Sequence, residues 1–261
     1  MLVTNSFREA TIACAPVVLI TGASGLVGTA VARAFSGAGM QLALHYHARE
    51  QAAHDLCAGL QHAGLRAVCI KANLAEPDGP EELVNQTKAQ LGDIDILIHA
   101  AAPKIRPCAP LTGNEEEIVV QLQINVLAFT RLCRAVLPSM LLRQQGVIIP
   151  LLSTVLEASR PKRWSPYTTA KFALAGAAVG LAKDVLDGGI RVVGVMPARV
   201  GEPESTTDGP AGVVPAERVG QIVRRVCDEP ETFQNGKIVR LEGRDVKVGE
   251  LIFSGTALAE A

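Results

Sequence analysis

The residues best suited to chemistry in this sequence are a tyrosine and a lysine four positions apart. Tyr167 and Lys171 enclose the segment Tyr-Thr-Thr-Ala-Lys, within a helix that we expect over residues 166–186. Residues four apart on a helix share one face, so the ammonium group should lie beside the phenol and lower the tyrosine pKa. Such a phenol can pass a proton to or from a carbonyl or alcohol oxygen. The spacing alone is common on protein surfaces, so the interpretation depends on the surrounding elements.

A glycine-rich turn is the second motif. The apolar run 17–21 leads directly into the sequence Gly-Ala-Ser-Gly-Leu-Val-Gly. Glycines after a first strand permit a tight turn, a close approach of the backbone to a pyrophosphate and close packing of the next helix. The free N–H groups at that helix start favour an anion. The spacing differs from G-x-G-x-x-G and also suits a plain tight turn, but its place favours a dinucleotide. The expected contacts are Gly22, Ser24, Gly25, Leu26, Val27 and Gly28.

The end of the second expected strand carries a signal for the type of dinucleotide. An acidic residue there would bind a ribose 2′-hydroxyl, whereas an arginine accommodates a 2′-phosphate. The sequence has His47 and Arg49 there, with no acidic residue before Glu50. We therefore predict NADP(H), with His47 and Arg49 at the phosphate. The alternative is that Arg49 only decorates the start of the next helix.

Short apolar runs alternate with longer amphipathic stretches along the chain. This alternation predicts βαβ units, a parallel sheet and helices on both faces. We expect one Rossmann-like, doubly wound α/β domain over residues 1–261, with an N-terminal extension at 1–16 and its ligand beyond the carboxyl ends of the strands. The long segment 197–215 is expected to be a substrate loop or, alternatively, a surface excursion. Strands are expected at 17–21, 41–47, 67–71, 94–100, 146–152, 190–196 and 237–241, and helices at 26–38, 49–63, 80–91, 114–143, 166–186 and 216–227.

Composition excludes several other classes of protein. The net charge of −1 offers no basic surplus for nucleic acid. None of the six cysteines forms a C-x-x-C pair and no histidine lies at metal-ligand spacing, so we expect no metal site and reduced thiols. No run of about 18 apolar residues predicts a membrane span. Residues 1–16 carry Arg8 and Glu9 and no apolar run of signal length, so we expect a cytoplasmic protein.

The glycine-rich turn, the Tyr/Lys pair and the strand order together resemble the short-chain dehydrogenase/reductase family, over about residues 17–241. That family has an Asn on the long helix before the Tyr, which Asn125 matches, and a Ser after the fifth strand, which falls on Ser153. Thr154 is the alternative, because it would restore the family's usual interval to the Tyr. The resemblance implies that Tyr167 is the general acid in reduction, that Lys171 tunes it and bonds the nicotinamide ribose, that Ser153 polarises the carbonyl and that Asn125 supports a water-linked proton path.

The resemblance implies further cofactor contacts, several at positions that depart from the family pattern. Asn73 stands where the family has an adenine-contacting Asp, and His-Ala-Ala-Ala at 99–102 replaces Asn-Asn-Ala-Gly. The glycine spacing is that of the family's extended branch, and Glu202 stands where a Thr is common. Together these changes favour a specialised or weakened enzyme. For His99 we favour a backbone-bonded, partly buried side chain over a cofactor contact. The expected contacts are Asn73, Leu74, Ala100, Ala101, Tyr167, Lys171, Pro197 and Val200.

The resemblance implies an NADP-dependent carbonyl reductase or alcohol dehydrogenase, similar to reductases of 3-oxoacyl thioesters on carrier proteins. Residues 44–47 also resemble pteridine reductases. A small or carrier-tethered carbonyl substrate would lie under 197–215 and beside 103–111, where Lys104 and Arg106 suit an anionic group. The alternative is a cofactor-binding sensor or partner subunit without turnover. The family also implies a homodimer or homotetramer, formed through the helices near 114–143 and 166–186.

Overall fold

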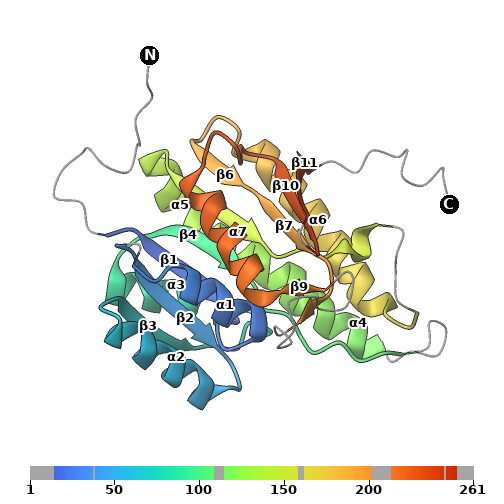
Figure 1. Ribbon diagram of the computed structural model, residues 1–261, viewed down its shortest axis with the longest axis horizontal. Helices are drawn as coiled ribbons and strands as arrows, with labels where there is room; N and C mark the ends of the chain where they lie inside the picture. The colour runs from blue at the N-terminus through green and yellow to red at the C-terminus, as the bar shows by residue number, and fades with distance from the viewer. Residues whose placement is uncertain are drawn as a thin grey trace.

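A parallel sheet lies at the centre of the protein (Figure 1). The computed structural model describes residues 15–37, 39–108, 115–157, 162–201, 213–243 and 245–251. Neighbouring strands pair in parallel in the order β3-β2-β1-β4-β5-β6. This order confirms the expected doubly wound, Rossmann-like fold. The strands are β1 (Val17–Thr21), β2 (Gln41–Tyr46), β3 (Arg66–Lys71), β4 (Ile94–His99), β5 (Gly146–Pro150) and β6 (Ile190–Val192).

Beyond β6 the structure differs from the expected strands. The run 190–196 is two strands, because the N–H of Val193 bonds to Ile148 O before β7 (Gly194–Pro197) turns to a new neighbour. β7 pairs with β10 (Lys237–Glu242), and β10 pairs antiparallel with β11 (Asp245–Glu250). β11 was not predicted because it is mostly exposed and has no apolar run. Two short strands, β8 (Val200–Gly201) and β9 (Val214–Pro215), pair within the expected substrate loop, whose residues 202–212 lie outside the described part.

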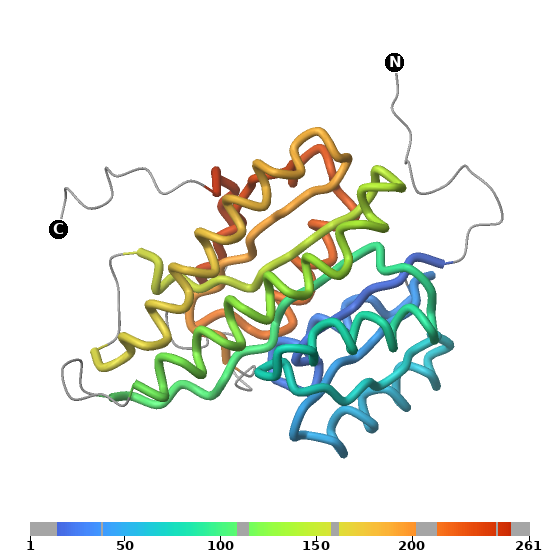
Figure 2. Tube along the Cα trace, turned by 180° about the vertical axis from the view of Figure 1, so that it is seen from behind, coloured from blue at the N-terminus to red at the C-terminus, as the bar shows by residue number. Residues whose placement is uncertain are grey.

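Helices cover both faces of the sheet, as Figures 1 and 2 show from opposite sides. Alternate residues of β1 enter different cores: Val18 and Ile20 pack with one set of helices, and Leu19 packs with the other. All the strand residues of β1 are buried, which explains the uninterrupted apolar run. One layer is α1 (Leu26–Ala34), α2 (Glu50–His62) and α7 (Ala216–Asp228), and the other is α3 (Gly79–Leu91), α5 (Ala128–Arg143) and α6 (Ser165–Asp184).

The long helix expected at 114–143 is interrupted. α4 (Glu115–Leu122) continues through a π-helical turn (Gln123–Leu127) into α5. By length and composition, 115–143 could cross a membrane, with a mean hydropathy of 1.3 over its most apolar part. This is weak support for a span, because α5 buries Phe129, Leu132 and Val136 against the sheet. These three side chains form the inner face of a core helix.

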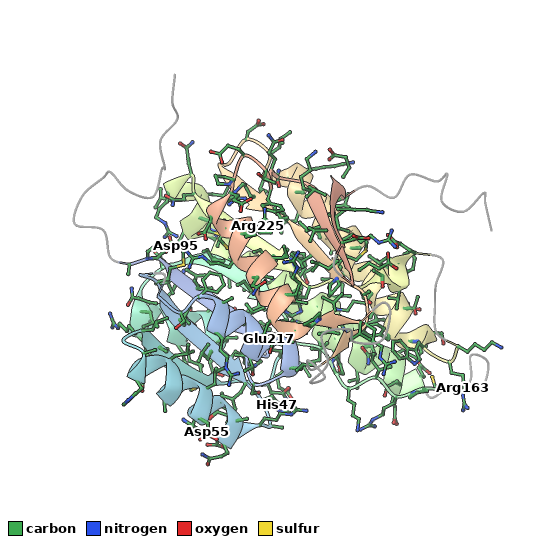
Figure 3. The ribbon with its side chains drawn as sticks, in the orientation of Figure 1. His47, Asp55, Asp95, Arg163, Glu217 and Arg225 are labelled. Carbon is green, nitrogen blue, oxygen red and sulfur yellow. The ribbon has the colours of Figure 1, made fainter. Side chains whose placement is uncertain are left out.

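The amino ends and the carboxyl ends of the parallel strands lie along opposite edges of the sheet, and the two edges carry different polar residues. At the amino edge, Asp95 accepts a hydrogen bond from the N–H of Val17 and pairs with Arg143 at 3.2 Å, a structural cluster. The carboxyl ends of β1, β2 and β4 meet at the opposite edge, where His47 lies (Figure 3). The strand order reverses between β1 and β4, and ligands of such sheets bind at this switch point.

Candidate active site

A cleft of about 720 Å³ opens at the carboxyl edge of β1, β2 and β4. It includes most of the cofactor contacts expected from the sequence. Val27 and Gly28 do not line it: Val27 packs on the core and Gly28 is buried. Pro197 and Val200 also lie outside its lining, at the end of β7 and in β8. Tyr167 and Lys171, the remaining expected cofactor contacts, lie outside it on α6. The expected contacts that line it are Gly22, Ser24, Gly25, Leu26, His47, Arg49, Asn73, Leu74, Ala100 and Ala101, and Lys104, Val120 and Ile124 are among its other lining residues.

The glycine-rich turn has no room for side chains. Gly22 has φ +67°, and a Cβ there would lie 2.8 Å from Cα of Ala101. A Cβ on Gly28 would lie 2.1 Å from the carbonyl oxygen of Gly22. Gly25 precedes α1, and no side chain caps this helix start. The N–H groups of the first turn therefore have no side-chain partner there. A backbone cradle at a helix start fits the pyrophosphate of a dinucleotide.

The charges beside β2 suit a second phosphate. His47 and Arg49 are exposed and line the cleft. The carboxylate of Glu50, which follows Arg49 in the sequence, lies 3.2 Å from Lys71 Nζ. The hydrogen bond from Lys71 and its charge hold the pKa of Glu50 below its ordinary value. Sequence reasoning missed Lys71, because nothing in a linear sequence pairs it with a residue 21 positions away.

A polar group of three side chains lies on α6 and the segment after β5. Lys171 is buried, donates to Leu151 O at 2.7 Å and lies 5.6 Å from the ring centroid of Tyr167. Ser153 hydrogen-bonds to Tyr167 and accepts from the N–H of Val155 at 3.4 Å. The structure therefore brings Ser153, Tyr167 and Lys171 together. Thr154 begins the short 3-10 helix that follows Ser153.

Asn125 occupies the π-helical turn and is fully buried. Its Nδ2 donates to the backbone oxygen of Gln121 at 2.9 Å and to Gln121 Oε1 at 3.1 Å. Gln121 Nε2 donates in turn to Glu117 at 3.2 Å. Because both Gln121 oxygens face Nδ2, Asn125 Oδ1 points away from them, and no partner for it occurs among the described residues. α6 packs against this turn. Sequence reasoning missed Gln121, although a Gln and an Asn at i and i+4 are a recognisable pair.

Comparison with known proteins decides the family. The family profile described as short chain dehydrogenase matches residues 16–208. The chain belongs to the short-chain dehydrogenase family. Oxidoreductase UcpA of Salmonella typhimurium is 29% identical over 252 residues, which cover 93% of this chain and 95% of that protein. A 3-oxoacyl-[acyl-carrier-protein] reductase of Synechocystis is 28% identical over 183 residues, covering 70% and 73% of the two chains.

A solved structure of the same family agrees with the architecture. A short chain dehydrogenase of Burkholderia cenocepacia, in complex with NADP, superposes with a TM-score of 0.76 at 25% identity, covering 87% of this chain and 96% of that one. The present chain is therefore an oxidoreductase of this family, which binds a nicotinamide cofactor. The glycine cradle of this dehydrogenase fits that group.

Burial dominates the pKa values of this dehydrogenase's polar group. It lowers the pKa of Lys171 to about 7. Burial raises the pKa of Tyr167, and the hydrogen bond from Ser153 only partly opposes it. The expectation that Lys171 lowers the tyrosine pKa is therefore wrong for this structure. The reason is that the same desolvation disfavours the ammonium charge and the phenolate.

The buried lysine should make folding stability depend on pH. An unfolded lysine keeps its proton up to about pH 10.5, whereas folded Lys171 loses it near pH 7. Between these values the unfolded state binds more protons, so stability rises with pH and falls toward pH 7. We expect the unfolding free energy of the wild type, measured by denaturant titration at pH 7 to 9, to rise by about 1 kcal/mol per pH unit relative to Lys171→Met.

Lys183→Met, at an exposed lysine on the same helix, is the matched control and should follow the wild type. Parallel curves for the wild type and Lys171→Met would contradict the shift.

Proposed function

We propose that this protein is an NADP(H)-dependent reductase of ketones, acting on 3-oxoacyl or related carbonyl substrates. The observation that carries the proposal is the hydrogen-bonded group of Ser153 and Tyr167 with the amine of Lys171 buried behind it. The bound cofactor supplies the hydride, and the protein supplies binding, orientation and protons. The reductase from Synechocystis supports the substrate class by similarity alone.

Each polar side chain has a role that follows from its position. Tyr167 Oη donates a proton to the carbonyl oxygen as reduction proceeds, and the hydroxyl of Ser153 holds the same oxygen. Lys171 supplies a hydrogen-bond donor beside the phenol and holds the ribose. Asn125 supports a water-linked path that returns a proton to Lys171, and its buried, unpartnered Oδ1 is an available acceptor for that water.

The charges beside β2 support NADP(H) over NAD(H). Arg49 and His47 offer donors to a 2′-phosphate, and Lys71 draws the carboxylate of Glu50 into an ion pair. A free carboxylate at this place would repel the phosphate. Lys104 also lines the cleft and adds to its positive character. The Burkholderia relative was solved in complex with NADP, which supports NADP(H) for the present chain by similarity alone.

We also propose that the dehydrogenase forms homodimers or homotetramers through α4, α5 and α6, in the cytoplasm. The five described cysteines form no disulfide, which suits a reducing compartment. Large apolar side chains are exposed along the long helix, up to 87% exposure at Leu142. Burying such side chains against a second copy is the ordinary way to remove them from water. The exposed residues of the long helix outside the cofactor cleft are Ile118, Val119, Leu127, Leu141 and Leu142.

Loss of the phenol should abolish turnover. We expect Tyr167→Phe to lower NADPH oxidation by at least about 100-fold, since it removes the general acid, while the NADPH dissociation constant stays within about threefold of wild type. The assay is NADPH consumption against a panel of ketones, 3-oxoacyl thioesters and pterins. A Tyr167→Phe variant with wild-type turnover would overturn the role. If the wild type binds NADPH but reduces no substrate of the panel, the alternative of a sensor or partner subunit is favoured.

The same assay distinguishes Ser153 from Thr154. Ser153→Ala should lower turnover at least about tenfold, whereas Thr154→Ala should leave it almost unchanged.

Removing Arg49 should change cofactor preference. Arg49→Ala should weaken NADPH binding by about 10- to 100-fold, as expected for lost charged hydrogen bonds, and leave NADH binding nearly unchanged. Fluorescence titration with both cofactors measures this. Arg33→Ala, at an exposed arginine of α1 outside the cleft, is the control. Equal weakening of both cofactors by Arg49→Ala would refute the 2′-phosphate assignment.

Sedimentation velocity tests the assembly. We expect the wild type to sediment as a dimer or tetramer, and Leu142→Glu to shift it toward smaller species because a carboxylate would be buried in the contact. Val248→Glu, at an exposed valine of β11, should leave the helix-mediated pairing intact. A wild type that sediments only as a monomer rules out the proposal.

A further inference from the structure

Two buried histidines flank the glycine-rich turn from the neighbouring strands. His45, in β2, accepts a hydrogen bond at Nδ1 from the N–H of Gly22, at 3.0 Å. Its Nε2 lies 3.1 Å from the carbonyl oxygen of Ala72. A carbonyl oxygen can only accept, so Nε2 carries the hydrogen and Nδ1 is the free lone pair. The ring is therefore neutral, with a single tautomer.

His99, in β4, has the same tautomer with different partners. Its Nε2 lies 3.0 Å from the carbonyl oxygen of Ile124, so Nε2 donates. Its Nδ1 lies 3.0 Å from Thr21 Oγ1. That hydroxyl already accepts from the N–H groups of Ala100 and Ala101, both at 3.1 Å. The single hydroxyl hydrogen of Thr21 therefore goes to His99, and every polar atom in this group has a partner.

The partners of His99 belong to two different parts of the site. Thr21 precedes the glycine of the cofactor-binding turn, and Ile124 precedes Asn125 in the π-helical turn. One imidazole thus joins the two. His45 touches the first part only, because its second partner, Ala72, follows β3. An amide side chain of the family's asparagine at position 99 is shorter than an imidazole and has its two polar atoms on one carbon.

We infer that His99 is a positioning residue for the proposed reaction: as a neutral Nε2–H imidazole, it ties the cofactor-binding turn to the turn that carries Asn125. His45 holds only the cofactor-binding turn. The effect of His99 on turnover rests on the proposed function, whereas its tautomer and its effect on cofactor binding do not.

The surroundings of both rings keep them neutral. Burial and then the charge of Lys171, from α6, lower the pKa of His99 to about 3, and His45 contributes in the same direction. Phe129, from α5, packs its ring 5.7 Å from that of His99. Burial lowers the pKa of His45 to about 4, and His47 on the same strand adds to the effect. A proton on Nδ1 of His45 would place two donors face to face at Gly22. A proton on Nδ1 of His99 would take away the acceptor of the Thr21 hydroxyl hydrogen. Each ring therefore keeps its bonds only when it is neutral.

Matched substitutions separate the two bonds of His99. An asparagine oxygen falls near the place of a histidine Nδ1, whereas the amide nitrogen of a glutamine reaches the place of Nε2. His99→Asn therefore keeps the acceptor for Thr21 and loses the bond to Ile124. We expect it to lower kcat by about tenfold with the NADPH dissociation constant within about threefold of wild type. His99→Gln keeps the bond to Ile124 and loses the acceptor for Thr21, so it should weaken NADPH binding and lower kcat less than His99→Asn does. His45→Asn loses the bond to Ala72 and should weaken NADPH binding more than it lowers kcat. His62→Asn, at an exposed histidine of α2 outside the cleft, is the control and should leave both quantities unchanged. A His99→Asn variant with wild-type kcat, or equal losses of kcat in His99→Asn and His45→Asn, would overturn the inference.

The tautomers are tested on the wild type without any turnover. Long-range ¹H–¹⁵N correlation spectra of the ¹⁵N-labelled protein should show two of the five histidines as Nε2–H tautomers that do not titrate between about pH 5.5 and 8. Loss of one such signal in each variant assigns them. This arm stands if no variant folds and if no carbonyl substrate is found, so its failure differs from failure of the proposed reductase. An imidazolium or an Nδ1–H ring at position 99 at pH 7 would overturn the inference.

Discussion

The cofactor cleft depends on a contact between two backbones, that of Gly22 after β1 and that of Ala101 after β4. A Cβ on Gly22 would lie 2.8 Å from Cα of Ala101, so the strand ends can converge only with a glycine there. Thr21 Oγ1 holds them together by accepting two backbone N–H groups from the segment after β4. The turn directed by this contact presents the start of α1 to the cleft. The position of α1, the convergence of the ends of β1 and β4 and the anion-binding turn therefore all depend on this one contact.

A second constraint concerns the lysine. Lys171 is placed where its amine reaches Leu151 O and faces the Tyr167 ring, at the price of burial that lowers its pKa to about 7. A leucine or methionine would suit this position better for stability alone, because it has no charge to desolvate. The protein keeps a destabilising group at the one place where a donor beside a phenol is useful for catalysis. Such conflict between local stability and chemistry is typical of functional sites.

Periodicity predicted most of the fold because parallel strands buried on both faces appear as continuous apolar runs, as β1 and β2 do. β11 escaped prediction because its residues are mostly exposed and polar. The π-helical turn was not predicted because its sequence, Gln-Ile-Asn-Val-Leu, is compatible with a regular α-helix. What local patterns cannot contain is pairing across the sheet: the Glu50–Lys71 ion pair and the bonds of His99 join residues 21 to 78 positions apart.

The departures from the family pattern take on a different meaning in this context. The segment 99–102 lost the family's asparagines and its glycine, but the groups that hold Thr21 are backbone N–H groups, which alanines supply equally well. At Asn73, the amide accepts from the N–H of Ala75 and donates to Glu76, so the local turn survives without a carboxylate. At positions 100 and 101 the support comes from backbone N–H groups, whereas at 73 and 99 it comes from the side chains of Asn73 and His99. The altered motifs are therefore compatible with an intact site, because the residues at these departures make hydrogen bonds that hold their segments in place.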